Sequence, residues 1–151
     1  ALDKTKKLFK DTENFSSIDI KEFCLIYILI NNLNFFYQRL DLLENIKFYK
    51  KENGLIFNQI LECLKIGNFD DLQVDNQLLD QIEKYANIKH IVHKNDKDES
   101  KIVEIFNDIK NELKTHDLEF RIQELESKFA EDFNQNTFDE INRLKKEQNI
   151  N

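Results

Sequence analysis

Proline is absent from this sequence and glycine occurs only twice, a restriction that limits the possible folds more than any motif does. These two residues build most tight turns, and glycine-rich loops cradle phosphates in nucleotide-binding folds. A chain with so few of them is poorly suited to β-hairpins and phosphate loops. Its 151 residues suffice for one core that buries about 70 % of the unfolded surface. We therefore expect an all-α protein.

The charge of the chain argues against nucleic acid as a direct partner. Its formal net charge is −7, and the nearest approach to a basic cluster is the group Lys4, Lys6, Lys7 and Lys10. Proteins that hold the DNA backbone cluster Lys and Arg, because each contact displaces condensed counterions. We therefore expect a protein partner and no direct binding of nucleic acid.

Apolar runs and cysteines indicate a cytoplasmic protein without a membrane segment. The longest apolar run, Phe23–Ile30, has eight residues, whereas a membrane helix needs about 20. Cys24 and Cys63 lie inside apolar runs, so we expect both to be reduced core residues. The chain contains no Met and begins with Ala1, so we expect it to be a piece of a longer protein.

Apolar spacing predicts several helices in the first two thirds of the chain, after a loose arm over residues 1–15. Ser16 or Ser17 is the expected cap of the first and most apolar helix, and Gly67 is the expected stop of a later one. Asp75 is the expected cap of the helix that follows. These helices are predicted over residues 19–32, 33–40, 54–66 and about 76–86, with a brief turn at 88–92. We expect residues 16–115 to form a helical bundle.

The most informative element is a predicted helix of more than 30 residues, from about Ser100 to Phe133. Its apolar residues change face near residues 116–120, because Leu118 lies about 160° around the helix axis from Phe120. One helix with two apolar faces should have two packing partners. Thr137 and Glu140 match a capping box, and a last helix is predicted to reach about residue 148. We therefore expect residues 116–151 to form a C-terminal helical hairpin that follows the long connecting helix.

No motif predicts catalysis. His90 and His93 have the spacing of two zinc ligands but lack placed partners. Asp96 and Asp98 resemble a magnesium-binding pair, yet they fall in a polar break where a solvated loop and a helix cap are the better interpretation. Phosphate-loop and nucleophile-elbow motifs are absent from the sequence. We expect no catalytic residue, no metal and no cofactor in this chain, and no enzyme activity.

The order of these elements resembles the C-terminal helicase-binding domain of bacterial DNA primase, of the DnaG type. The resemblance spans about residues 16–148 and rests on order and spacing, since no stretch is diagnostic alone. Four stretches carry it: Glu22–Ile30, Phe106–Leu113 with its apolar spacing, Arg121–Glu126 and Glu140–Glu147.

The resemblance implies a role in DNA replication. The terminal hairpin would dock onto the N-terminal domain of the replicative DNA helicase, which would recruit primase to the replication fork and modulate helicase activity and RNA-primer synthesis. A single-stranded-DNA-binding protein is a further candidate partner. The parent protein would be a DNA-directed RNA polymerase whose zinc-binding and catalytic domains precede Ala1.

The residues expected to contact the helicase lie on the hairpin. They are Phe129, Phe133, Phe138, Ile141, Arg143, Leu144, Lys145 and Gln148. Apolar side chains among them would fill a groove between partner helices, and basic side chains would orient docking. In the alternative interpretation, the apolar residues only pack within the hairpin. Two other functions stay open at this point: a self-associating helical scaffold, and the N-terminal domain of the replicative helicase itself.

Overall fold

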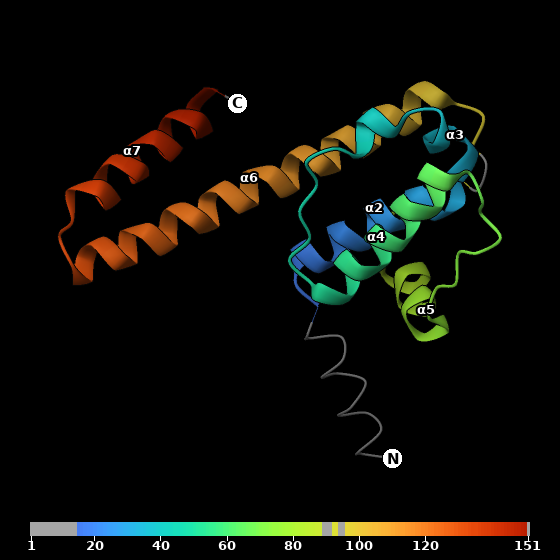
Figure 1. The fold of residues 1–151 in the computed structure, drawn as a ribbon, viewed down its shortest axis with the longest axis horizontal. Helices are drawn as coiled ribbons and strands as arrows, with labels where there is room; N and C mark the ends of the chain where they lie inside the picture. Colours follow the sequence, from blue (N-terminus) through green and yellow to red (C-terminus); the bar gives the residue numbers. More distant parts are fainter. Residues whose placement is uncertain (1–14, 89–91, 94–95, 151) are drawn as a thin grey trace, which may run out of the picture. The chain divides into compact units, whose positions relative to one another are not determined.

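The structure, a computed structural model, describes residues 15–88, 92–93 and 96–150 (Figure 1). No strand occurs in these ranges, which confirms the predicted all-α class. The elements are α2 (Ser17–Asn31), α3 (Leu33–Tyr37), the 3₁₀ helix η1 (Leu40–Leu43), α4 (Lys51–Ile66), α5 (Asn76–Tyr85), α6 (Glu99–Glu131) and α7 (Gln135–Ile150). The chain divides into two compact units between Lys110 and Asn111, inside α6. The predicted division after residue 115 stays a prediction, and residues 1–14 of the predicted arm lie outside the described residues.

Helix α2 is the central helix of the first unit and packs against α3, α4 and α5. Ser16 caps it as predicted: its side chain accepts a hydrogen bond from the Asp19 N–H at 3.2 Å, and the Asp19 carboxylate accepts one from the Ser16 N–H at 3.1 Å. The helix therefore begins two residues before the predicted start. None of the helices in the described ranges has the length and hydropathy that a membrane crossing requires.

Helix α4 begins at Lys51, three residues before its predicted start, and a carboxylate of α2 binds the residues around this start. Lys50 makes no side-chain capping bond. Instead the carboxylate of Glu22 accepts hydrogen bonds from the N–H groups of Tyr49 and Lys50, the latter at 3.2 Å, and from the side chain of Asn53 at 3.1 Å. Glu22 is fully buried, and this burial raises its pKa above the usual 4.5. A contact between two helices thus fixes the start of α4.

Two helix ends follow the predicted local signals. Gly67 ends α4 with a left-handed φ of 79°, and its N–H donates to the Cys63 carbonyl at 2.9 Å. A Cβ at Gly67 would lie 3.2 Å from the ring of Tyr37, so space as well as conformation favours glycine. Asp75 caps α5 by accepting a hydrogen bond from the Gln77 N–H at 3.0 Å.

Helix α6 has 33 residues and, as predicted, buries two different faces. Its buried residues are Ile102, Phe106, Ile109, Leu113, Leu118 and Ile122. The steps between them are three or four residues except for the step of five from Leu113 to Leu118, which moves the buried stripe around the axis. Phe120, which lies on the other face from Leu118, is 42 % exposed, so the first buried stripe ends at Leu113. Asp98 caps the helix by accepting from the Lys101 N–H at 3.1 Å.

The first part of α6 completes the first unit. The rings of Phe36 and Phe106 lie 4.9 Å apart, and the Lys110 ammonium donates to the Leu42 carbonyl at 3.0 Å. The predicted turn at 88–92 falls mostly outside the described residues, although the Val92 N–H donates to the Ile88 carbonyl at 3.0 Å. The bundle thus closes around α2 with aromatic and aliphatic side chains from α3 and α6.

Candidate protein-binding surface

In the second unit, α7 runs back along the second part of α6 as an antiparallel hairpin (Figure 1). Leu118, Ile122 and Leu144 form its buried core, with Leu125 packed against them. Ile141 is only 5 % exposed. Two of the residues predicted to contact a partner, Ile141 and Leu144, are therefore inside the hairpin and do not reach its surface.

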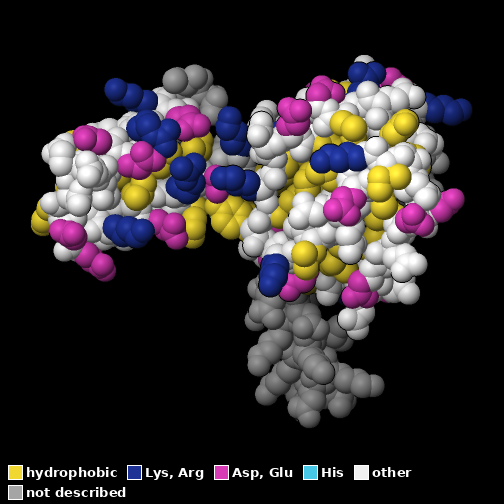
Figure 2. All heavy atoms as spheres, in the orientation of Figure 1, with side chains coloured by type: hydrophobic (Ala, Val, Ile, Leu, Met, Phe, Trp, Pro, Cys, Tyr) yellow, Lys and Arg dark blue, Asp and Glu magenta, His cyan; other side chains and the backbone are white. Residues whose placement is uncertain are grey.

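Three phenylalanines gather where α6 ends and α7 begins, and we call them the aromatic tip: Phe129, Phe133 and Phe138. The Phe129 ring lies 5.1 Å from the Phe133 ring and 5.7 Å from the Phe138 ring. Phe129 is half-buried between its neighbours, whereas Phe133 is 79 % exposed and Phe138 is 44 % exposed. In Figure 2, hydrophobic side chains reach the surface of the hairpin between charged ones. The structure therefore brings these three predicted residues together.

A short connection places the aromatic tip. Residues 132–134 join the two helices, and Asn134 caps α7 by accepting a hydrogen bond from the Asn136 N–H at 2.8 Å. The predicted capping box of Thr137 and Glu140 is wrong, because α7 begins at Gln135 and Thr137 already lies in its first turn. Asparagine is as good a cap as threonine, and this earlier cap leaves Phe133 in the connection.

The predicted polar contact residues lie on α7 and are partly engaged within the hairpin. Arg143 forms ion pairs with Glu140 and, at 3.9 Å, with Glu147. The hydrogen bond from Arg143 lowers the pKa of Glu140. Lys145 pairs with Glu126 of α6 at 3.0 Å. Gln148 is half-buried. The positive charges of Arg143 and Lys145 are thus paired with carboxylates of the hairpin itself.

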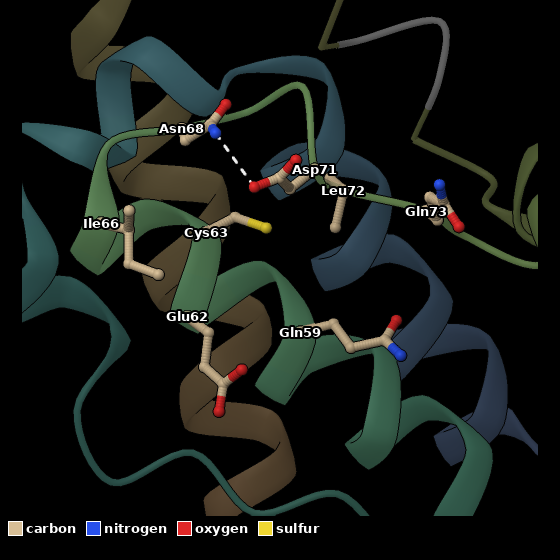
Figure 3. Close-up of a pocket in the computed structure, with 8 residues that line it drawn as sticks. All are labelled: Gln59, Glu62, Cys63, Ile66, Asn68, Asp71, Leu72 and Gln73. Carbon is tan, nitrogen blue, oxygen red and sulfur yellow. Dashed lines mark hydrogen bonds between the residues drawn. The ribbon is translucent and has the colours of Figure 1, made fainter.

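A pocket of about 350 Å³ lies between α4 and the segment that follows it (Figure 3). Cys63 and Leu72 line it together with the carboxylates of Glu62 and Asp71, and Asn68 donates a hydrogen bond to Asp71 at 3.0 Å. A cysteine nucleophile is commonly activated by a neighbouring histidine, and the residues that line this pocket include no histidine. Cys63, predicted as a core residue, is only half-buried here, whereas Cys24 is buried.

In the loop before α6, the carboxylate of Asp96 stabilises the loop conformation. Asp96 accepts hydrogen bonds from the N–H groups of His93 and Asp98, each at 3.0 Å, and pairs with Lys101 at 2.9 Å. These bonds, first of all the one from His93, hold the pKa of Asp96 well below its usual value. The Asp96 N–H donates to the side chain of Asn32, which ties the loop to the end of α2.

We expect Asp96→Asn to lower the melting temperature at neutral pH, because it removes the ion pair with Lys101. The pKa of Asp96 is lower in the folded chain than the ordinary 3.8. The stabilisation is therefore complete above the unfolded pKa and is lost as the pH falls through the folded pKa. Melting curves from pH 7 to pH 2 should show the two proteins converging at acidic pH, while Asp80→Asn, at an exposed position, should match the wild type throughout. A constant difference at every pH would contradict this role of the carboxylate.

The remaining candidate site is the histidine pair. His90 lies outside the described residues, so its predicted relation to His93 is not observed. Within the described ranges, no group of three or more His, Cys, Asp or Glu residues is arranged to hold a metal ion.

Comparisons of this chain with family models, with curated proteins and with solved structures gave no significant match. The aromatic tip is thus the feature on which a functional argument rests.

Proposed function

We propose that this chain is a non-catalytic, helicase-binding domain of a bacterial DNA primase, and that its aromatic tip docks onto the N-terminal domain of the replicative DNA helicase. The observation that supports this proposal best is the exposure of Phe133 and Phe138 at the end of a helical hairpin. The order of bundle, long helix and terminal hairpin agrees with the resemblance described above. The chain would recruit primase to the replication fork in the cytoplasm.

The physical case for docking rests on the cost of exposing aromatic rings. A Phe side chain left in water forgoes about 1.5–3 kcal/mol of burial free energy, and contiguous apolar surface usually marks an interaction site. The ring of Phe129 contacts the rings of both Phe133 and Phe138. Both rings are therefore partly ordered before a partner binds, which reduces the entropy lost on docking.

We expect Phe133→Asp and Phe138→Asp each to weaken binding to the replicative helicase by about 30-fold, the effect of losing a central aromatic contact. The matched control is Ile66→Asp, because Ile66 ends α4 in the first unit and is 78 % exposed, close to the 79 % of Phe133. Binding is measured by titrating the intact helicase of the same organism with labelled chain, and helical content by circular dichroism.

Unchanged affinity for both Phe variants would remove the aromatic tip from the interface, and equal losses in all three variants would point to a non-specific effect. If the free wild-type chain forms stable dimers that Phe133→Asp dissociates, the aromatic tip is instead a self-association surface, as the scaffold alternative requires.

A further inference from the structure

We infer that the surface that receives the aromatic tip is cationic, an apolar pocket bordered by Lys or Arg side chains. This inference rests on the proposed function and adds the chemistry of the partner surface. It reverses the expectation from sequence, in which the basic residues of α7 orient docking.

The acidic character of the aromatic tip comes from residues beside its rings in the chain. Residues 129–139 contain three carboxylates, Glu131, Asp132 and Asp139, and no Lys or Arg. All three side chains are exposed. Glu131 and Asp132 precede Phe133 directly and Asp139 follows Phe138, so each exposed ring has a carboxylate beside it in the chain.

Two cations of α7 pair with carboxylates that lie outside the aromatic tip. Arg143 pairs with Glu140 and Glu147, and Lys145 pairs with Glu126. Asp139 accepts a hydrogen bond from the neutral side chain of Gln135 at 2.9 Å. In the part of the chain that the structure describes, none of the three tip carboxylates forms an ion pair. Lys128 is the nearest cation in the chain, and residues 128–139 still have a net charge of −2 with it included. A docking partner therefore meets exposed rings and net negative charge together.

This combination selects the partner surface by charge. An apolar pocket bordered by Asp or Glu would place like charges opposite one another, which costs several kcal/mol at an interface. Lys or Arg at the border would attract the tip during encounter, and the attraction would weaken as salt shortens the screening length to about 10 Å at 0.1 M and 3 Å at 1 M. Salt dependence is thus the signature of a cationic partner.

The test is a triple variant that removes the three charges but keeps the rings: Glu131→Gln, Asp132→Asn and Asp139→Asn. We expect its affinity for the intact replicative helicase to be about tenfold lower than that of the wild type at 50 mM salt. The difference should shrink at 500 mM salt. The matched control neutralises three exposed acids of the first unit, Glu62→Gln, Asp70→Asn and Asp80→Asn, so that both variants have the same net charge.

The possible outcomes separate the inference from the proposed function. A loss in the tip variant alone, with a flatter salt dependence, supports the cationic surface. Unchanged or tighter binding by the tip variant overturns the cationic surface while leaving the helicase proposal standing. No binding by the wild type at any salt overturns both. If the triple variant loses helical content, Asp132→Lys alone replaces it and should weaken binding by at least as much per charge.

Discussion

Replacement of Glu22 by alanine is expected to destabilise the first unit by about 3 kcal/mol. The carboxylate satisfies the N–H groups of Tyr49 and Lys50 and the side chain of Asn53 at the start of α4. Removing the acceptor takes away these three hydrogen bonds, of which the one from Asn53 is buried, and a lost partner for a buried donor costs about 1–3 kcal/mol. Urea titration followed by circular dichroism measures the loss. Glu52→Ala is the control, because Glu52 is exposed in the first turn of the same helix and should contribute no more than about 1 kcal/mol through the helix dipole.

The pH dependence of Glu22 has the opposite sign to that of Asp96. Burial raises the pKa of Glu22 above 4.5 in the folded chain. Its effect on stability is therefore most favourable below the unfolded pKa and diminishes as the pH rises through the folded pKa. Glu22→Gln keeps one acceptor oxygen, so we expect a loss smaller than that of Glu22→Ala and no such pH dependence from this position. If Glu22→Ala matched Glu52→Ala in stability, the hydrogen bonds between Glu22 and the start of α4 would not be what stabilises the first unit.

Replacement of Leu144 by aspartate is expected to detach α7 from α6. Leu144 is fully buried in the core of the hairpin. Truncating a buried Leu already costs about 2–5 kcal/mol, and an unpaired charge at the same place adds its desolvation. An isolated helix of 16 residues is only marginally stable in water. We therefore expect a fall in helical content equivalent to much of α7, while the cooperative unfolding of the first unit persists.

Asn142→Asp is the control for this experiment, because it introduces the same side chain two residues away at an exposed position of α7. It should leave the helical content unchanged. A Leu144→Asp variant with the full circular dichroism signal and the wild-type melting curve would contradict the hairpin core. The same comparison matters for binding: Leu144→Asp should weaken helicase binding indirectly, by unfolding the hairpin, whereas Phe133→Asp should do so without structural loss.

Local signals account for the parts of the fold that could be predicted. Ser16, Gly67 and Asp75 act within three or four residues of themselves, so the sequence alone locates the helix ends that they form. Glu22 escaped prediction because its partners lie 27–31 residues further along the chain. From the sequence alone, Glu22 is expected to be an ordinary acidic residue in the first turns of its own helix. Its burial is visible only once α2 and α4 pack.

The arrangement of the hairpin residues could be predicted only in part, for a similar reason. The apolar spacing predicts which residues of the hairpin share one stripe. It cannot say which residues of that stripe the other helix covers. The length of the connection decides this, and the choice between Asn134 and Thr137 as cap sets that length. With Asn134 as the cap, Ile141 and Leu144 are buried, and Phe133 is left exposed.

The most direct test of the proposed function is hydrogen exchange of the whole chain, measured by mass spectrometry with and without the intact replicative helicase. Helix ends open more readily than helix interiors, so we expect the connection over residues 132–134 and the first turn of α7 to exchange quickly in the free chain. We expect the helicase to slow exchange in peptides that cover residues 129–139 and to leave peptides of α4 and α5 unchanged. Slowed exchange confined to the first unit, or no change anywhere at saturating helicase, would contradict docking through the aromatic tip.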